Sequence, residues 1–256
     1  MQQAHEIEQE LKRLRMPGAF QQLDHRLVQA QEQGLGYLEF LSLVLHDELA
    51  NREANNFTKR LSQASLGTRE TFDRFDFRFN DEVFPAATVR DLASCRFIHQ
   101  HTNLAIAGPP GIGKTFIVKA IGHEACRQGN TVLFRSTQRL LSDLLRASPD
   151  RQRRLLKKAC DVDVLILDDF AFRSLDQHEA EMLYIIAEER IGISSTILTS
   201  NRPPQDWYSV FPDPIVGGAI LDRMVSGAIK LVTSKGRSYR KEVHGSHAKT
   251  SAPPKS

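Results

Sequence analysis

Hydrophobic residues at the start of the chain recur at three- and four-residue spacing, which is typical of amphipathic helices. Two breaks, Pro17-Gly18 and Gly34-Leu35-Gly36, divide this stretch into three helical segments. The apolar positions of the segments are Leu11, Leu14, Leu23, Leu27, Ala30, Leu38, Leu41, Val44, Leu45 and Leu49. Strand-like alternation is missing from this pattern, so it predicts a small all-helical domain over residues 1–66.

A linker is expected over residues 67–82, where four phenylalanines alternate with charged residues. They are Phe72, Phe75, Phe77 and Phe79. Such rings could stack on the bases of a nucleic acid. Burial against the edge of the next domain is the more usual fate of large rings, and we expect it here. One or two short helices are then expected between residues 83 and 101.

Short apolar runs and helix-like segments alternate over residues 83–243, which we take as a second domain of α/β class. The run at 162–167, Val-Asp-Val-Leu-Ile-Leu, is nearly all apolar and predicts a buried strand of a parallel sheet. Further β-prone runs occupy residues 104–107, 131–134, 195–200 and 229–232. Residues 244–256 are polar and contain Pro253-Pro254, so we expect a disordered tail there.

A complete phosphate-loop motif follows the first of these strands. It consists of Gly108, Pro109, Pro110, Gly111, Ile112, Gly113, Lys114 and Thr115, with Phe116 next. Glycines let backbone N–H groups approach a phosphate, and the following helix turns its positive end toward it. Lys114 would contact the β- and γ-phosphates, and the Thr115 hydroxyl would bind Mg²⁺. A chance glycine-rich turn is the alternative, but the strand before and the helix after the loop favour nucleotide binding.

Polar side chains also follow two later strands. Asp168 and Asp169 end the run at 162–167, and Asn201 ends the run at 195–200. Ligands bind at the carboxyl ends of strands in open α/β sheets, so Asp168 is expected to hold Mg²⁺ and Asp169 to activate water as general base. Asn201 could hydrogen-bond that water or the γ-phosphate. In isolation it would be interpreted as a turn residue.

Positively charged residues allow a second ligand, a nucleic acid, without requiring one. Arg223 could pair locally with Asp222 or reach the γ-phosphate in a neighbouring subunit as an arginine finger. The helical domain carries Arg13, Arg15, Arg26, Arg52, Lys59 and Arg60, and residues 151–158 read Arg-Gln-Arg-Arg-Leu-Leu-Lys-Lys. Each group could bind DNA phosphates or simply face solvent.

The composition indicates in which cellular compartment the protein works. The 256 residues are 41% hydrophobic and 25% charged, with a formal net charge of +3, as in ordinary globular proteins. Three distant cysteines form neither a disulfide framework nor a metal motif, which favours a reducing compartment. The first residues show no signal-peptide pattern, and no apolar run is long enough to span a membrane. We expect a cytoplasmic protein without membrane contact.

The order of motifs resembles the IstB-like transposition helper ATPases of bacterial insertion sequences, relatives of the DnaC-type helicase loaders within the AAA+ class. The phosphate loop, Leu-Ile-Leu-Asp-Asp at 165–169, Ser-Asn-Arg-Pro-Pro-Gln-Asp-Trp at 200–207 and Gly-Arg-Ser-Tyr-Arg at 236–240 carry the resemblance. It implies a P-loop NTPase with a three-layer core and a parallel sheet behind the helical domain. It also assigns Asn201 to the sensor-1 position, Arg223 to the arginine-finger region and Arg240 to the sensor-2 or closing basic position.

The resemblance further implies a function. ATP, with Mg²⁺, would drive a homo-oligomer to assemble on duplex DNA, and that complex would recruit and stimulate the transposase encoded by the same element. The pair Asp168-Asp169 departs from the Asp-Glu of many AAA+ proteins, so slow hydrolysis is expected. A DnaC-like loader that grips a replicative helicase through residues 1–66 remains the alternative function.

Overall fold

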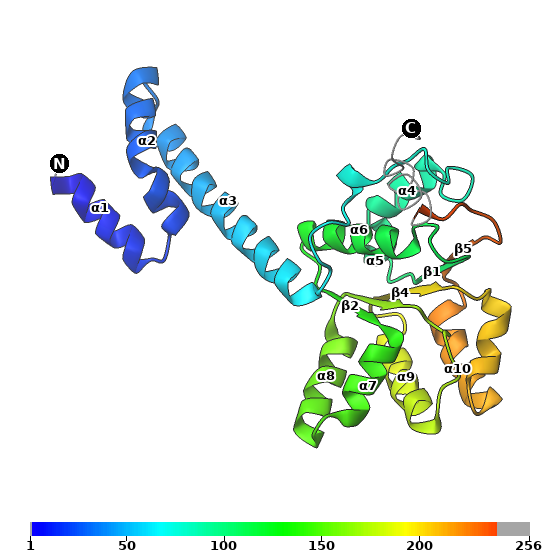
Figure 1. The fold of residues 1–256 in the computed structure, drawn as a ribbon. Coiled ribbons are helices and arrows are strands. Elements are labelled where there is room, and N and C mark those ends of the chain that lie inside the picture. The colour runs from blue at the N-terminus through cyan, green and yellow to red at the C-terminus, as the bar shows by residue number, and fades with distance from the viewer. Residues whose placement is uncertain (1, 240–256) are drawn as a thin grey trace, which may run out of the picture. The chain divides into compact units, whose positions relative to one another are not determined.

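Three helices open the chain in this computed structural model, which describes residues 2–239. They are α1 (Gln2–Arg13), α2 (Pro17–Gln33) and α3 (Tyr37–Ala64) (Figure 1). Proline at the first position of α2 and a left-handed Gly34 at its end account for both predicted breaks. By contacts the chain forms two compact units that divide between Lys59 and Arg60.

The start of α2 packs closely against α3 within the first unit. A Cβ on Gly18 would lie 2.5 Å from the Cβ of Asn51, so only glycine fits there. Met16, the N-cap residue, makes no side-chain cap. Instead Glu48 of α3 accepts hydrogen bonds from the backbone N–H groups of Gly18 (2.8 Å) and Ala19 (3.3 Å). A carboxylate from a neighbouring helix therefore caps α2, where the helix dipole favours negative charge.

A five-stranded sheet with the order β2-β3-β4-β1-β5 forms the centre of the second unit, and every strand pair is parallel. The strands are β1 (Leu104–Ala107), β2 (Val132–Ser136), β3 (Val164–Asp168), β4 (Ser195–Ser200) and β5 (Ile229–Val232). All residues of β1, β3 and β4 are buried, which explains why their sequences read as continuous apolar or small residues.

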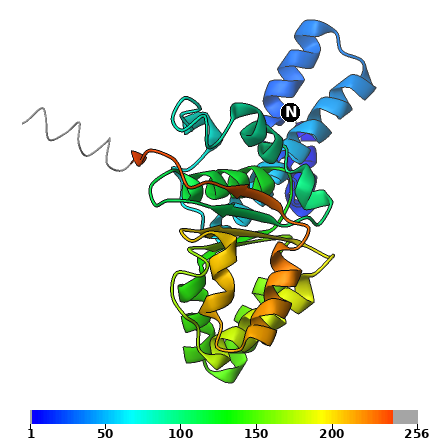
Figure 2. The same ribbon diagram turned by 90° about the vertical axis from the view of Figure 1, so that its right-hand side faces the viewer.

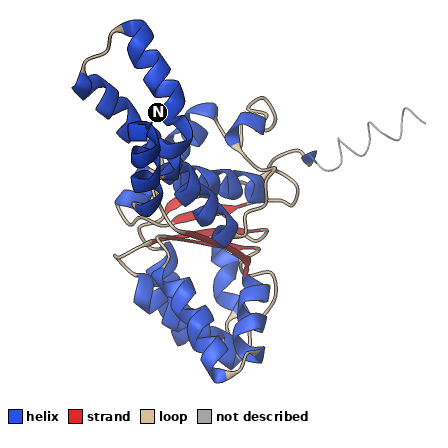
Figure 3. Cartoon of the chain, turned by 90° about the vertical axis from the view of Figure 1, so that its left-hand side faces the viewer, coloured by secondary structure: helices blue, strands red, loops and turns tan. Residues whose placement is uncertain are grey.

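Helices cover both faces of this sheet, as the two side views show (Figure 2, Figure 3). One layer contains α4 (Ala86–Ala93), α5 (Arg96–His99) and α6 (Lys114–Arg127). The other contains α7 (Thr137–Arg146), α8 (Pro149–Asp161), α9 (Gln177–Arg190) and α10 (Pro214–Val225). Short 3₁₀ helices, η1 (Phe72–Arg74) and η2 (Pro204–Val210), lie in the linker and after β4. The α/β class, the parallel sheet and the preceding helices are thus confirmed.

Some further details were not predicted or cannot be tested. Helix α10 begins at Pro214, where the Asp213 side chain caps it by accepting a hydrogen bond from the Ile215 N–H at 2.8 Å. The four linker phenylalanines are half-buried. Arg240 and the expected tail at 244–256 lie outside the described residues, and the boundaries at 66, 82 and 243 stay predictions.

Replacing Glu48 with alanine is expected to loosen the start of α2. Leaving the backbone N–H groups of Gly18 and Ala19 without an acceptor costs about 1–3 kcal/mol for buried groups. Hydrogen exchange of the segment 17–33 in the full-length chain measures the loss. Glu53→Ala, an exposed change on the same helix, is the control. Equal exchange in the Glu48 variant and the unmodified chain would contradict the capping role.

The same contact predicts a pH dependence. Burial raises the pKa of Glu48, but hydrogen bonds from Arg52, Ala19 and Gly18 more than offset this and hold the pKa below its ordinary 4.5. A carboxyl with a lowered folded-state pKa stabilises the fold above its ordinary pKa, and that stability is lost as the pH falls through the lowered value. Exchange of segment 17–33 should therefore rise below about pH 4.5 in the unmodified chain. Glu48→Gln, which does not titrate, should not show this contribution.

Candidate functional site

The phosphate-loop residues form the bend between β1 and α6, with Lys114 as the first residue of the helix. Gly111 and Gly113 have left-handed backbones, with φ of 85° and 110°. A Cβ on Gly108 would lie 2.8 Å from Ile112 Cδ1. Each of the three glycines is therefore needed, either for its backbone angle or for space. The predicted strand, loop and helix are all present.

Lys114 is buried and its ammonium lies at the centre of the loop. Its Nζ donates to the carbonyl oxygens of Gly108 (2.8 Å) and Pro109 (2.9 Å) and to Oδ1 of Asn201 (2.8 Å). A buried ammonium is tolerated only with such acceptors. These contacts bring the ends of β1 and β4 together around one positive charge.

Asp168 ends β3 and turns its buried carboxylate toward the start of α6. Thr115 Oγ1 lies 3.0 and 3.1 Å from its two oxygens, and Thr199 Oγ1 donates to Oδ1 of the same carboxylate. Thr137 Oγ1 donates to the Asp168 backbone oxygen at 3.1 Å. The carboxylate is thus held in one orientation by hydroxyl groups from two elements, α6 and β4, and a hydroxyl group of α7 holds the Asp168 backbone.

This donor set fits a magnesium ion. Mg²⁺ prefers oxygen ligands and takes one or two protein groups, with phosphate and water supplying the rest. The Thr115 hydroxyl and the Asp168 carboxylate are two such oxygens beside the loop. Among residues 2–239 no cluster of three or more histidine, cysteine or acidic side chains forms a separate metal site. The residues present therefore suit a metal carried in with a nucleotide.

Asp169 faces solvent next to the buried Asp168. Its backbone is left-handed, with φ of 54°, and its N–H donates to Thr199 Oγ1 at 3.1 Å. Asn201 Nδ2 lies 3.3 Å from Asp169 Oδ1, while the Asn201 oxygen accepts from Lys114. One amide therefore joins the loop lysine to the second carboxylate. Thr199 joins Asp169 to Asp168, which contacts Thr115, so the five predicted polar residues form a single connected network.

A cleft of about 570 Å³ opens over this network, within the usual range for small-molecule sites. Its polar floor includes Lys114, Thr115, Asp168, Asp169 and Asn201. Aromatic side chains form one wall of the cleft, and Glu70, Arg74 and Asp76 also line it; the aromatic residues are Phe75, Phe79, Phe116, Phe172 and Tyr239. A floor that holds phosphate and metal beside an aromatic wall suits a nucleotide. Two of the four linker phenylalanines, Phe75 and Phe79, thus lie in this wall.

Arg223, a predicted residue in the described part of the chain, is not part of this cleft. Arg223 lies on α10, where its Nε donates to Glu188 at 2.5 Å and its guanidinium stands 5.2 Å from the ring centre of Tyr184. The predicted pairing with Asp222 is replaced by this pair with Glu188. A residue that serves a neighbouring subunit must lie away from its own site, so the position is compatible with a finger. Arg240 lies outside the described residues.

Sequence reasoning missed the supporting residues Thr199, Thr137 and Asn80. Thr199 could have been suspected from the sequence, because it stands two residues before Asn201, the spacing at which side chains of a strand face the same side. Nothing in the sequence pointed to Asn80. Its side chain bonds the loop carbonyl of Ile112 (3.2 Å) and the backbone of Arg237, 157 positions away.

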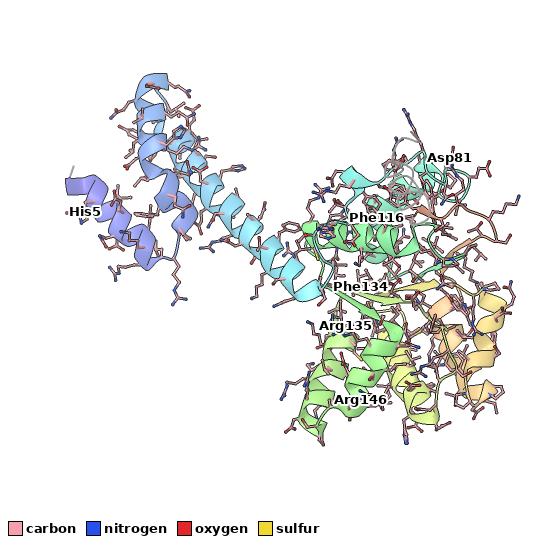
Figure 4. All side chains as sticks on the ribbon, in the orientation of Figure 1. His5, Asp81, Phe116, Phe134, Arg135 and Arg146 are labelled. Atoms are coloured by element: carbon pink, nitrogen blue, oxygen red, sulfur yellow. The ribbon has the colours of Figure 1, made fainter. Side chains whose placement is uncertain are left out.

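The basic residues separate into two groups. In the helical unit Arg13, Arg26 and Arg52 pair with Glu10, Asp47 and Glu48. On α8, Arg151, Arg153 and Arg154 are exposed. Figure 4 shows Arg135 at the end of β2 and Arg146 at the far end of α7, so cations also flank the neighbouring helix. Exposed cations are therefore present in both places, because Arg13, Arg15, Arg52 and Lys59 of the helical unit are exposed as well.

Cys95, Cys126 and Cys160 are free thiols, and burial raises the pKa of Cys95 to about 12 and that of Cys126 to about 11. Within residues 2–239 no helix has the length and apolar character needed to cross a membrane.

Comparison with known proteins agrees with this geometry. The family model of the IstB-like ATP binding protein matches residues 9–247. An ATP-binding protein of an insertion sequence from Mycobacterium tuberculosis is 39% identical over 232 residues, covering 90% of this chain and 92% of that protein. The ATP-binding protein of insertion sequence IS21 from Pseudomonas aeruginosa is 35% identical over 237 residues, covering 92% of this chain and 89% of that protein.

Among solved structures, the DnaC helicase loader superposes with a TM-score of 0.55 at 21% identity, covering 64% of this chain and 97% of that chain. At this identity the likeness concerns the fold, which is that of the AAA+ P-loop proteins. Relatives more than 30% identical, matched over nine-tenths of the chain, establish more than the fold. Together with the loop, the strand-end acids and the cleft, they show that the chain belongs to the IstB-like ATP-binding protein family.

Proposed function

We propose that the chain is an ATPase that acts as an assembly switch in transposition: with ATP and Mg²⁺ bound it oligomerises on duplex DNA and recruits the transposase of its element. The carrying observation is the network from Lys114 through Asn201 to Asp169, beside Thr115 and Asp168. It joins a phosphate-binding lysine, a metal-binding pair and a candidate base within one cleft. The relatives' names, which link ATP binding to insertion sequences, support the biological setting.

In this proposal each residue has one task. Lys114 exchanges its contacts with the loop carbonyls for β- and γ-phosphate oxygens, and the loop N–H groups bind the same phosphates. Thr115 and Asp168 would hold Mg²⁺, which supplies charge neutralisation on the phosphates. Asp169 accepts the proton of the attacking water, and Asn201 orients that water or the γ-phosphate. The short Asp169 side chain supports slow turnover, which suits a switch.

The domains and the location of the protein complete the proposal. Residues 1–66 would contact the partner or DNA, 67–82 would act as linker, and 83–243 would form the ATPase domain. A protein that assembles on bacterial DNA works in the cytoplasm, which we propose as its location.

The family's insertion-sequence members support the transposition helper over a DnaC-like loader, whose likeness covers only 64% of this chain. A transposase gene next to this one would support the helper, and a replication gene the loader.

Lys114→Ala is expected to abolish nucleotide-dependent assembly on DNA. The charge-assisted bonds of an ammonium to phosphate are worth about 1.5–3 kcal/mol each, so ATP affinity should fall at least about tenfold. Titration with a fluorescent ATP analogue and particle size with and without ATP measure both effects. Lys230→Ala, an exposed lysine on β5, serves as control. Unchanged ATP-dependent assembly in the Lys114 variant would refute the proposal.

Arg223→Ala should leave ATP binding intact and remove the rise in hydrolysis on assembly. Arginine fingers contribute about a thousandfold or more to phosphoryl transfer, so the stimulated rate should fall at least about a hundredfold. Glu188→Gln is the matched control, because it breaks the same exposed ion pair and keeps the guanidinium. Weaker ATP binding by the monomeric Arg223 variant would count against the finger.

Arg153→Gln combined with Arg154→Gln should weaken binding to duplex DNA. Each DNA phosphate that a cation no longer neutralises reduces the slope of log affinity against log salt by about 0.9, so the pair should reduce it by about 2. Filter retention of a duplex at several salt concentrations gives the slope. Arg96→Gln, on α5 in the other helix layer, should leave it unchanged. An unaltered slope in the double variant would exclude α8 as the DNA surface, and preference for single strands would favour the loader.

A further inference from the structure

Residues 236–239, named here the strap, lie directly against the phosphate loop. The Tyr239 N–H donates to the Gly111 carbonyl oxygen at 3.0 Å. A Cβ on Gly111 would lie 2.3 Å from Ser238 Oγ, and one on Gly236 would lie 2.7 Å from Ile112 Cγ2. Both glycines also have positive φ, 85° and 131°. The loop and the strap therefore approach each other at distances that only glycine permits.

One buried side chain from the linker fastens these two segments. Asn80 donates from Nδ2 to the carbonyl oxygens of Ile112 (3.2 Å) and Arg237 (2.8 Å), and its Oδ1 accepts from the Arg237 N–H at 2.7 Å. Its backbone is left-handed with φ of 56°, a conformation that asparagine adopts more readily than most residues. Asn80 thus binds the linker, the loop and the strap at one point.

The strap also forms part of the cleft wall. The rings of Phe79 and Tyr239 meet edge to face with centroids 5.1 Å apart, and the Arg237 guanidinium lies 5.1 Å from the Phe79 ring centre. Phe79 and Tyr239 both line the cleft over the loop. Removing the strap from the loop would therefore remove Tyr239 from this wall.

We propose that Asn80 is a positioning residue that holds the strap closed on the phosphate loop, and that the closed strap is the form that binds a nucleoside triphosphate. This inference rests on the proposed function and concerns the regulation of the same site. Gly236 and Arg237 are exposed, so the strap lies at the surface, where segments open locally at lower cost than in the core. Opening removes a wall of the cleft, so closure of the strap raises the affinity for nucleotide. By linkage, bound nucleotide shifts the equilibrium between open and closed strap toward the closed form by the same factor.

Asn80→Gly tests the inference, because glycine keeps the left-handed backbone while all three side-chain hydrogen bonds disappear. Affinity for a fluorescent ATP analogue should fall about tenfold, as expected when the binding form no longer has these bonds. Trypsin cleavage after Arg237, read by mass spectrometry, gives an independent measure of strap opening. It should accelerate in the variant, because the Arg237 backbone N–H and C=O are both bonded to Asn80 in the closed strap.

Asn103→Gly is the matched control. Asn103 also bridges two segments, accepting from Thr196 N–H (2.7 Å) and donating to the Arg223 carbonyl (3.1 Å), but it precedes β1 at the opposite edge of the sheet. Its removal should change nucleotide affinity by less than about twofold, since it lies far from the site. In the unmodified chain, saturating ATP analogue should slow cleavage after Arg237.

The outcomes separate this inference from the proposed function. If the unmodified chain binds the analogue, and the Asn80 variant binds it equally well, the inference is overturned while the proposed function stands. Nucleotide that leaves cleavage after Arg237 unchanged in the unmodified chain overturns the inference as well, whatever the variant does. An unmodified chain that binds no nucleotide overturns both.

Discussion

The Lys114 ammonium, buried at the carboxyl edge of a parallel sheet, is the charge on which the arrangement of the site depends. A buried cation requires acceptors, and the loop carbonyls and Asn201 supply them in the structure. The strand order makes this possible, because β1, β4 and β3 are adjacent and their ends bring together residues far apart in sequence. In the proposed function the same acceptors are exchanged for phosphate oxygens, so a contact that the fold needs would also serve binding.

Much of this site could be predicted from the sequence, since the loop motif has fixed spacing and strand ends of an α/β sheet share one edge. Lys114, Asp168 and Asn201 were predicted on those grounds. Strand order is not encoded locally, so the contact between Asn201 and Asp169 could not be foreseen. Asn80 was beyond reach for the same reason: its partner Arg237 is 157 positions away, and a single asparagine in a linker carries no periodic signal.

Arginines in this chain serve different purposes. Arg26 is paired bidentately with Asp47 inside the helical unit, so its charge serves packing. Arg153 and Arg154 are exposed on α8 and can meet another molecule. Arg223 has an intermediate character: it is paired, but with the exposed Glu188, and such surface pairs contribute about 0–1 kcal/mol. Whether an arginine stabilises the fold therefore depends on how deeply its carboxylate partner is buried. The sequence next to the arginine does not show this.

A crystal structure of the full-length chain with Mg²⁺ and a non-hydrolysable ATP analogue tests the central claim most directly. The account predicts that the triphosphate lies along the bend at residues 108–115, that Lys114 Nζ has left the carbonyl oxygens of Gly108 and Pro109 for phosphate oxygens, and that Thr115 and Asp168 flank the metal. A triphosphate bound elsewhere, or a Lys114 that keeps its carbonyl contacts with the nucleotide present, would contradict it.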